Sequence, residues 1–287
     1  MEIIKHQMPD SFQVYDLSDL HLGSPNCAEE TLMEVVAEIE DNPDAYVIFK
    51  GDAIEAILPN DKRYLHSAVR EGLQSPKAQA DRVIEIFKPV ADRILAWGIG
   101  NHELKLWNTM DFGKYMADQL EAPYGAYNFK IHYQDRHGDL MFKTYHTHGM
   151  GSVSSNAKDE IQYDANRKAG LKHKLVKSGH ADCIYMSRGH DHQLIIVEPT
   201  VNNKLFLTDD GEGIHQRYHT ASPQNAEYIS PDNRWYATTG SFRKLYSKPG
   251  LGTIDYAEVV GYSPSEIGYA KMYVENRTLV CVDKVVA

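Results

Sequence analysis

The sequence predicts an α/β protein in which strands and helices alternate through the first half of the chain. Residues 12–17, 45–49 and 94–97 are short apolar runs, and the run at 45–49 has the composition of a strand buried on both faces. Helical patterns separate the runs, and polar residues follow each run directly. This order favours an α/β sheet whose strand ends carry the functional groups.

The first predicted helix covers residues 27–41, because its apolar residues fall on one face. That face consists of Leu32, Val35, Val36 and Ile39. Asn26 and Glu29 stand three residues apart at its start, as in a capping pair. A second helix is predicted to begin at Ser75-Pro76, because proline is tolerated in the first position of a helix.

The second half of the chain has a different pattern. Residues 126–133 and 140–147 are predicted strands on either side of a polar turn at 137–139. A basic helix is predicted at about 157–178, and the last hundred residues are strand-like with turn signals such as Asp209-Asp-Gly. No linker-like stretch separates the halves, which favours a single domain.

Composition excludes several classes of protein. The 287 residues include 30 basic and 40 acidic side chains, so the formal charge is −10. Such a charge argues against a general nucleic-acid coat and against a surface that binds anionic membranes. No run approaches the 18 apolar residues of a membrane span, so no membrane partner is expected. The 14 histidines are a high count for this length.

The cysteines indicate a reducing compartment. Cys27, Cys183 and Cys281 are odd in number and far apart, which suits neither a disulfide framework nor a zinc–thiolate site. The first residues lack the basic and apolar segments of a signal peptide. We therefore expect a cytoplasmic location.

Five polar blocks follow the apolar runs or later predicted strands. Three are strand tips: Asp19-Leu-His21, Gly51-Asp52 and Gly100-Asn-His-Glu103. Two more are His146-Thr-His148-Gly149 and Gly189-His-Asp-His192. Because the carboxyl ends of strands line the ligand crevice of an α/β sheet, these blocks are expected to converge. Carboxylates, an amide oxygen and imidazoles without thiolate suit manganese, iron or zinc, and there are enough groups for two ions.

Each block alone is a weak signal. Asp135-Arg-His137 has the same D-x-H pattern in an apparent turn, where we interpret it as a solvated loop. Gly-Asp favours turns in general, and two histidines on one strand can both be merely exposed. The argument for a site therefore depends on five blocks in a fixed order, three of them at strand ends.

That order resembles the calcineurin-like metallophosphoesterase family, whose pattern is D-x-H, G-D, G-N-H-[DE], H-G and G-H-x-H. The matching blocks span residues 19–192. The resemblance implies a four-layer α-β-β-α sandwich with two mixed sheets flanked by helices. A later family strand ends in Gly-Ser, as does 238–241 here. The implied organisation is one domain, 1–287, with its core motifs in 12–193 and with 194–287 completing the second sheet.

The resemblance also implies roles for individual residues. The first metal ligands would be Asp19, His21 and His192, and the second set would be Asn101, His148 and His190. Asp52 would bridge two divalent transition-metal ions, with Mn²⁺ expected and iron or zinc as alternatives. Such ions lower the pKa of a shared water and clamp a phosphoryl centre, so a bridging hydroxide would attack without a covalent nucleophile.

Other residues near these blocks have two open interpretations each. In the family, the residue matching His102 stabilises the transition state or protonates the leaving oxygen, and Glu55 stands where a partner usually orients it. Glu55 can equally be a solvated carboxylate. His146 is either a contact to ligands or substrate or a structural histidine, and Arg188 either binds a phosphate oxygen or is an ordinary arginine.

The substrate is the least determined feature. Lys172 and Lys174 lie in a basic segment, 166–178, that either steers a nucleotide or a nucleic-acid strand or is a solvated helix face. The predicted activity is hydrolysis of a phosphodiester of a nucleotide or nucleic acid. A phosphomonoesterase, acting on a protein or a small molecule, is the alternative. A non-catalytic scaffold is disfavoured, because every ligand position is filled. The sequence predicts no oligomeric state.

Overall fold

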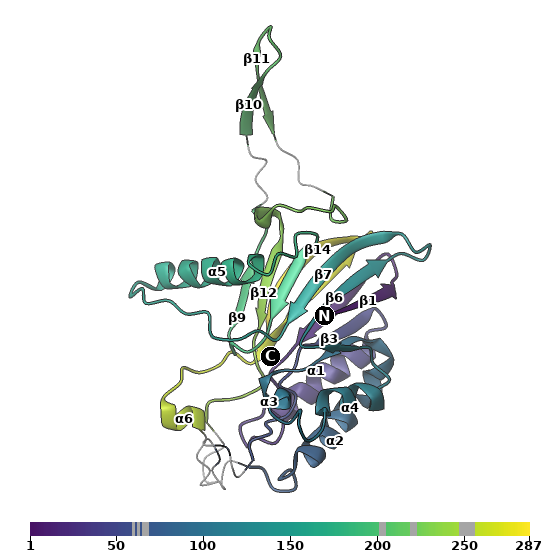
Figure 1. Cartoon of the computed structure of the whole chain (residues 1–287), viewed down its shortest axis with the longest axis vertical. Helices are drawn as coiled ribbons and strands as arrows, with labels where there is room; N and C mark the ends of the chain where they lie inside the picture. Colours follow the sequence, from purple (N-terminus) through teal and green to yellow (C-terminus); the bar gives the residue numbers. More distant parts are fainter. Residues whose placement is uncertain (59–60, 62–63, 65–68, 201–204, 219–222, 247–255) are drawn as a thin grey trace.

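The computed structural model of the chain describes residues 1–58, 61, 64, 69–200, 205–218, 223–246 and 256–287. Two six-stranded mixed sheets pack face to face, and helices lie on their outer faces (Figure 1). The protein is therefore an α/β sandwich with the four layers expected.

The first sheet has the order β14-β13-β2-β3-β4-β5. Its strands are β2 (Phe12–Leu17), β3 (Ala45–Phe49), β4 (Ile94–Gly98), β5 (Tyr124–Ala126), β13 (Gly268–Glu275) and β14 (Thr278–Val286). The second sheet has the order β1-β6-β7-β8-β12-β9. Its strands are β1 (Glu2–Gln7), β6 (Asn128–Gln134), β7 (Leu140–Thr147), β8 (Tyr185–Arg188), β9 (Leu194–Val197) and β12 (Trp235–Thr239).

The helices divide between the two outer faces. The first sheet is covered by α1 (Glu29–Asp41), α2 (Pro76–Phe87), the 3₁₀ helix η2 (Lys88–Arg93) and α4 (Phe112–Gln119). The second is covered by α5 (Glu160–Val176), which buries Leu171 and Leu175 against β8, β9 and β12. Three short helices, α3 (Asn101–Leu104), η3 (Pro231–Asn233) and α6 (Tyr256–Val260), lie in connections.

The core between the sheets takes inward-facing residues from both. Val14 and Ile48 of the first sheet belong to one buried cluster with Ile131 and Tyr185 of the second. On the other face of the first sheet, Phe49 packs with the helices. Alternate residues of β3 thus serve both faces, which explains the continuous apolar run in the sequence.

Most predicted elements are confirmed, with one error at a helix start. The predicted strands 12–17, 45–49 and 140–147 match β2, β3 and β7, and Ser75 caps α2 by accepting the Ala78 N–H. The capping pair at α1 is wrong: the N-cap is Ala28 without a side-chain bond. The side-chain amide of Asn26 instead donates to the carbonyl of Leu245 at 3.0 Å, and Leu245 belongs to a segment that is distant in the sequence.

The loop at 135–137 is a turn between β6 and β7, but its first residue is not solvated. Asp135 is 1% exposed, and its Oδ1 accepts the N–H groups of His137 and Asp139. Its Oδ2 lies 2.7 Å from Arg277 Nη1. Asp135 therefore closes this turn and joins it to the β13–β14 hairpin.

The C-terminal hundred residues contribute to both sheets, which differs from the expected completion of the second sheet alone. Strands β9 and β12 extend one sheet, and β13 and β14 extend the other by pairing β13 with β2. The hairpin β10 (Leu205–Asp209) and β11 (Ile214–Tyr218) lies beyond the sheets (Figure 1). In the described part of the chain, no helix is both long and apolar enough to cross a membrane.

A buried ion pair lies between the sheets. Lys50 Nζ donates to Asp16 Oδ1, and neither side chain is exposed. Tyr185 Oη also donates to Asp16, at 2.6 Å from Oδ2. Lys50 directly precedes the Gly51-Asp52 tip, and Asp16 lies three residues before Asp19. The pair therefore anchors two of the strand ends that carry polar tips.

We expect Lys50→Met to lower the free energy of unfolding by about 3–5 kcal/mol, because Asp16 would remain as a buried, unpaired charge. Urea unfolding in the presence of a chelator measures this. The double variant Asp16→Asn/Lys50→Met is the control and should recover part of the loss. A single variant as stable as the parent protein would contradict the expectation.

Candidate metal centre

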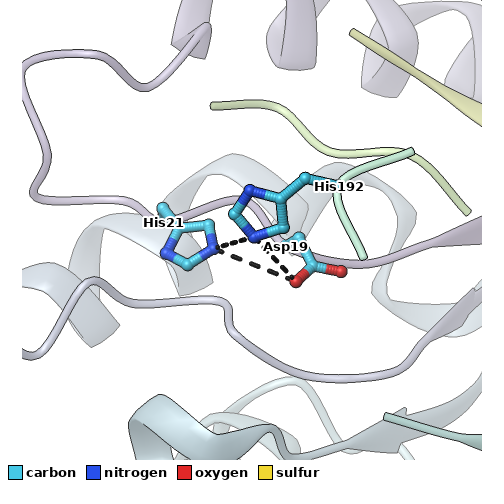
Figure 2. A group of neighbouring side chains, drawn as sticks. All are labelled: Asp19, His21 and His192. Carbon is cyan, nitrogen blue, oxygen red and sulfur yellow. Dashed lines mark hydrogen bonds and ion pairs between the residues drawn. The ribbon is translucent and has the colours of Figure 1, made fainter. Parts of the chain in front are cut away.

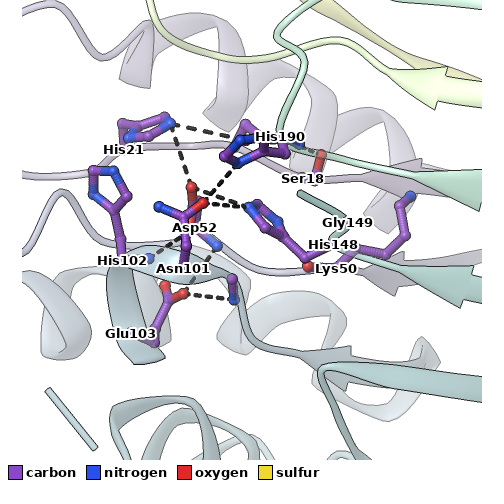
Figure 3. Close-up of polar contacts among 12 residues, drawn as sticks. Ser18, His21, Lys50, Asp52, Asn101, His102, Glu103, His148, Gly149 and His190 are labelled. Atoms are coloured by element: carbon purple, nitrogen blue, oxygen red, sulfur yellow. Dashed lines mark hydrogen bonds and ion pairs between the residues drawn. The ribbon is translucent and has the colours of Figure 1, made fainter. Parts of the chain in front are cut away.

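The polar tips meet at one end of the two sheets. Strands β2, β3 and β4 are adjacent and parallel, so Asp19, Asp52 and Asn101 emerge side by side after them. In the second sheet, β7 and β8 are also parallel neighbours, and they bring His148 and His190 to the same place. Figure 3 shows side chains from both sheets around Asp52. The expected convergence of the five blocks is therefore present.

One group of donor atoms comprises Asp19, His21 and His192 (Figure 2). The Nε2 atoms of His21 and His192 are 2.9 Å apart. Oδ1 of Asp19 lies 3.3 Å from His192 Nε2 and 3.9 Å from His21 Nε2. Three donors thus face one point, although His21 and His192 are 171 residues apart in the sequence.

A second group comprises Asp52, His148 and His190, with Asn101 between the two rings (Figure 3). Asn101 Oδ1 lies 3.1 Å from His148 Nε2 and 2.6 Å from His190 Nδ1. Asp52 Oδ2 is 3.2 Å from His148 Nε2 and 4.0 Å from His21 Nε2. Asp52 therefore lies between the two groups.

The backbone at these residues adopts an uncommon conformation. Asp19, His21, Asp52, His190 and His192 have φ angles of 56°, 52°, 53°, 72° and 52°. They make up half of the ten non-glycine residues with positive φ in the described ranges. This region is costly for residues with a Cβ, and such conformations concentrate at functional sites. The fold holds these five side chains inward at the expense of local strain.

Two motif glycines allow the strand tips to approach each other. A Cβ on Gly51, whose φ is 105°, would lie 2.0 Å from the backbone nitrogen of Gly100. A Cβ on Gly100 would lie 2.1 Å from Asp52 Oδ1. Any side chain at either position would therefore displace Asp52 or the neighbouring tip.

The charges at the site favour ionised carboxylates. Burial raises the pKa of Asp52, but the nearby His148 and His102 outweigh it and hold that pKa well below its usual range. The pKa of Asp19 is likewise lowered, because the bond to His192 and the charge of His148 outweigh burial. Burial opposes a charge on His148, yet Asp52 and Asp19 raise its pKa to about 9.

This donor set fits divalent transition metals. Within each group the donor atoms lie within 4.8 Å of one another, and they are carboxylate oxygens and imidazole nitrogens. The amide oxygen of Asn101 adds a further donor, and no thiolate is present in the groups. Manganese, iron and zinc accept such mixed nitrogen and oxygen ligands.

His102 lies beside the two groups, and Glu55 contacts it through the backbone and not through the carboxylate. Its Nδ1 donates to the main-chain carbonyl of Glu55, whereas the Glu55 carboxylate lies 2.7 Å from Nδ1 of His21. Glu55 therefore contacts His102 through its backbone and orients His21 through its side chain. Burial lowers the pKa of His102 to about 4 even though Asp52 and Glu55 raise it. His102 also forms a third donor group with His21 and Asp52.

Glu103 has a role that the sequence alone did not suggest. Its buried carboxylate accepts four backbone N–H groups: Asp52 at 3.0 Å, Ala53 at 2.7 Å, Ile54 at 3.2 Å and Gly100 at 2.8 Å. Burial and the charge of Asp52 raise its pKa to about 7. Glu103 thus holds the tips after β3 and β4 together. Its place three residues after Gly100, as in a capping box, was the available signal.

We expect Glu103→Gln to weaken metal binding by about 10- to 100-fold, the usual cost of removing an outer partner of a metal site. The amide has one acceptor oxygen, so some of the four N–H groups would lose their acceptor. Titration with Mn²⁺ measures this. Glu34→Gln, at an exposed position of α1, is the control and should bind normally. Equal affinities for the two variants would contradict the role.

The structure buries His146 and Arg188, the two residues for which a contact to ligands or substrate was one of two interpretations. His146 is fully buried, with Nδ1 2.9 Å from Ser187 Oγ and Nε2 2.8 Å from Thr144 Oγ1. It is a structural histidine, because neighbouring side chains cover its ring. Arg188 is 3% exposed and donates to the carbonyls of Met150 and Gly151. Its guanidinium therefore holds the loop after β7.

The basic segment on α5 is partly neutralised. Lys172 Nζ lies 2.5 Å from Asp232 Oδ1, and Lys168 pairs with Asp164. Lys174 borders a separate surface pocket with Met150 and Ser178, whose lining includes none of the donor residues. Neither Lys172 nor Lys174 lines the pocket that the donor residues line.

A cavity of about 430 Å³ opens over the donor groups. His21, Asp52, Asn101, His102, His190 and His192 line its floor. Its walls include residues that sequence reasoning missed, notably Arg243, Lys244 and Tyr262 from the C-terminal part of the chain. The one available signal was the Gly240-Ser241 strand end, which Arg243 follows by two residues.

No model of a known protein family matches this sequence, and no curated protein is similar to it in sequence. Among solved structures, a metallophosphoesterase from Sphaerobacter thermophilus matches at 12% identity and a TM-score of 0.39, over 96% of this chain and 88% of that one. The NAD nucleotidase NadN from Haemophilus influenzae matches at 11% identity and a TM-score of 0.37, over 98% of this chain. This chain spans 50% of the length of NadN.

Proposed function

We propose that this protein is a calcineurin-like, metal-dependent phosphoesterase with a dinuclear site. Asp19, His21 and His192 would hold one ion, and Asn101, His148 and His190 the other. The observation that carries the proposal is the position of Asp52, whose Oδ2 lies 3.2 Å from His148 and 4.0 Å from His21. A carboxylate placed between two donor groups can serve both ions and offset their repulsion.

Each residue at the site would have its own role in the proposed reaction. Two divalent ions supply Lewis-acid activation of water and stabilise charge on the phosphate oxygens. Asp52 and Glu103 hold the strand tips that present the ligands. His102 lines the cavity floor, and with Nδ1 bonded to the Glu55 carbonyl it would act on the leaving oxygen as a hydrogen-bond donor or general acid in its protonated form. Glu55 fixes the ring of His21 and, through its carbonyl, that of His102.

The cavity supports a small substrate. Its volume of about 430 Å³ lies in the range of small-molecule sites. The proposed substrate is therefore a small phosphate ester, either a nucleotide phosphodiester or a phosphomonoester. A single-stranded nucleic acid is less supported, because Lys172 is paired with Asp232 and Lys174 lies in another pocket. Manganese is the proposed metal, and the three free cysteines favour a cytoplasmic location.

A substrate panel tests this function. Protein loaded with Mn²⁺, Fe²⁺ or Zn²⁺ is assayed on p-nitrophenyl phosphate, bis(p-nitrophenyl) phosphate, a cyclic nucleotide and single-stranded DNA. Metal-dependent release from at least one ester supports the proposal, and the ratio of monoester to diester assigns the type. Two bound ions without hydrolysis of any ester would instead favour a non-catalytic scaffold.

A further inference from the structure

The turn that follows β8 carries two of the candidate ligands with a buried acid between them. His190 belongs to one donor group and His192 to the other, and Asp191 separates them in the sequence. Oδ2 of Asp191 lies 3.2 Å from Arg188 Nε, and the two side chains are 1% and 3% exposed. Removing two charges from water costs free energy, which a protein recovers through good geometry and further hydrogen bonds.

Both members of this ion pair make such further bonds, and the bonds go to the loop after β7. Arg188 donates to the carbonyl of Met150 at 3.2 Å and to that of Gly151 at 2.6 Å. Oδ1 of Asp191 accepts the main-chain N–H of Val153 at 2.6 Å. A guanidinium supplies donors and a carboxylate supplies acceptors, so the pair bonds to backbone groups of both kinds. The pair therefore fixes the backbone of this loop at three residues.

This loop, residues 149–153, begins directly after a third candidate ligand, His148 (Figure 3). Its first residue, Gly149, has a φ angle of 79°, and a Cβ there would lie 2.8 Å from Arg188 Nε. The guanidinium thus packs against the backbone next to His148. Near the other end of the loop, Ser152 lines the cavity over the donor groups. A displacement of the loop would therefore affect both a ligand and a wall of the cavity.

We propose that Arg188 and Asp191 are a positioning pair for the metal centre. They join the turn that carries His190 and His192 to the loop that follows His148, and so set the three ligands relative to one another. Asp191 borders the cavity but belongs to none of the donor groups, so the pair acts through its neighbours. This inference rests on the proposed function, whose metal site it extends.

Titration with Mn²⁺, followed by calorimetry, tests the positioning role without substrate. We expect Arg188→Gln and Asp191→Ala to weaken binding of at least one of the two ions by about 10- to 100-fold, as for other partners of metal ligands. Asp191→Asn should lose less affinity than Asp191→Ala, because its amide oxygen can still accept the Val153 N–H. Arg188→Lys should also retain part of the affinity, since its ammonium group keeps a positive charge opposite Asp191.

Asp182→Asn is the matched control, because Asp182 belongs to an ion-pair cluster at the opposite end of β8. Asp182 precedes the strand and lies 2.6 Å from Lys130 Nζ and 2.9 Å from Lys143 Nζ, whereas Arg188 is the last residue of the strand. This variant should unfold at a lower urea concentration than the parent protein and bind Mn²⁺ with the parental affinity. The comparison separates a loss of ligand positioning from a general loss of stability.

Hydrogen exchange of the Val153 amide in the metal-free protein gives a second readout, and it should be faster in Asp191→Ala. Folded variants with faster exchange but parental Mn²⁺ affinity would make the pair purely structural, which would overturn the inference and leave the proposed function intact. Weakened Mn²⁺ binding in the variants of a parent protein that hydrolyses no ester would overturn the proposed activity and leave the positioning role standing. A parent protein that binds no Mn²⁺, Fe²⁺ or Zn²⁺ would overturn the metal centre and the positioning role together.

Discussion

Asp52→Asn is expected to bind at most one of the two ions and to lose most phosphoesterase activity. The substitution replaces a carboxylate that lies between both donor groups with a neutral amide that has one acceptor oxygen. Without its charge, repulsion between two ions is no longer offset. The loss of activity should exceed the ~10- to 100-fold reduction that follows removal of a residue that only contacts a metal ligand.

Elemental analysis of the purified variant, together with the rate on the best ester of the panel, measures both effects. Asp41→Asn, at the exposed C-terminal end of α1, is the matched control and should bind two ions. Circular dichroism must show that Asp52→Asn is folded. A folded variant with two ions and full activity would rule out the dinuclear mechanism.

His102→Ala is expected to retain both ions and to turn over about 10²–10⁴-fold more slowly. The ring lines the cavity floor and is held by the Glu55 carbonyl, so its removal takes away a positioned donor while leaving the ligands in place. Metal content and kcat are measured on the same preparation. His137→Ala, at an exposed turn, serves as the control histidine.

Metal content decides between two roles for His102. It lies in a donor group with His21 and Asp52, so a ligand role is geometrically available. Loss of an ion from His102→Ala would make it a ligand, and an unchanged rate with both ions bound would remove it from the mechanism. Only a slow variant with two ions supports the role of an acid or hydrogen-bond donor.

Local patterns were sufficient to predict the strands that carry the site. The apolar runs of β2, β3 and β4 are visible in sequence because these strands are buried on both faces. Parallel neighbours end at the same edge, so the convergence of Asp19, Asp52 and Asn101 followed from those runs and the polar residues after them. Helix α2 was equally predictable, since its cap and its proline are local signals.

Side-chain partnerships were not predictable in the same way. The position of Glu55 suggested a partner for His102, yet its carboxylate contacts His21. His146 lies in β7 two residues before His148, but neighbouring side chains from β7 and β8 bury it completely. Asn26 does not cap the helix as expected; its side-chain amide bonds instead to a carbonyl 219 residues away in the sequence. In each case, several partners satisfy the local pattern, and the packing of distant segments selects one.

The sequence by itself determined the α/β class, the strand ends and the set of nitrogen and oxygen donors, because these depend on local periodicity and residue chemistry. The tertiary structure alone decided what surrounds that set. It placed the Glu103 carboxylate where four backbone N–H groups donate to it, and it placed the Arg188 guanidinium against the carbonyls of a loop. It also placed Arg243 next to Glu55, whose carboxylate contacts His21. Those contacts join strand ends and loops from different sheets. Their partners follow from how the two sheets pack, which no local pattern encodes.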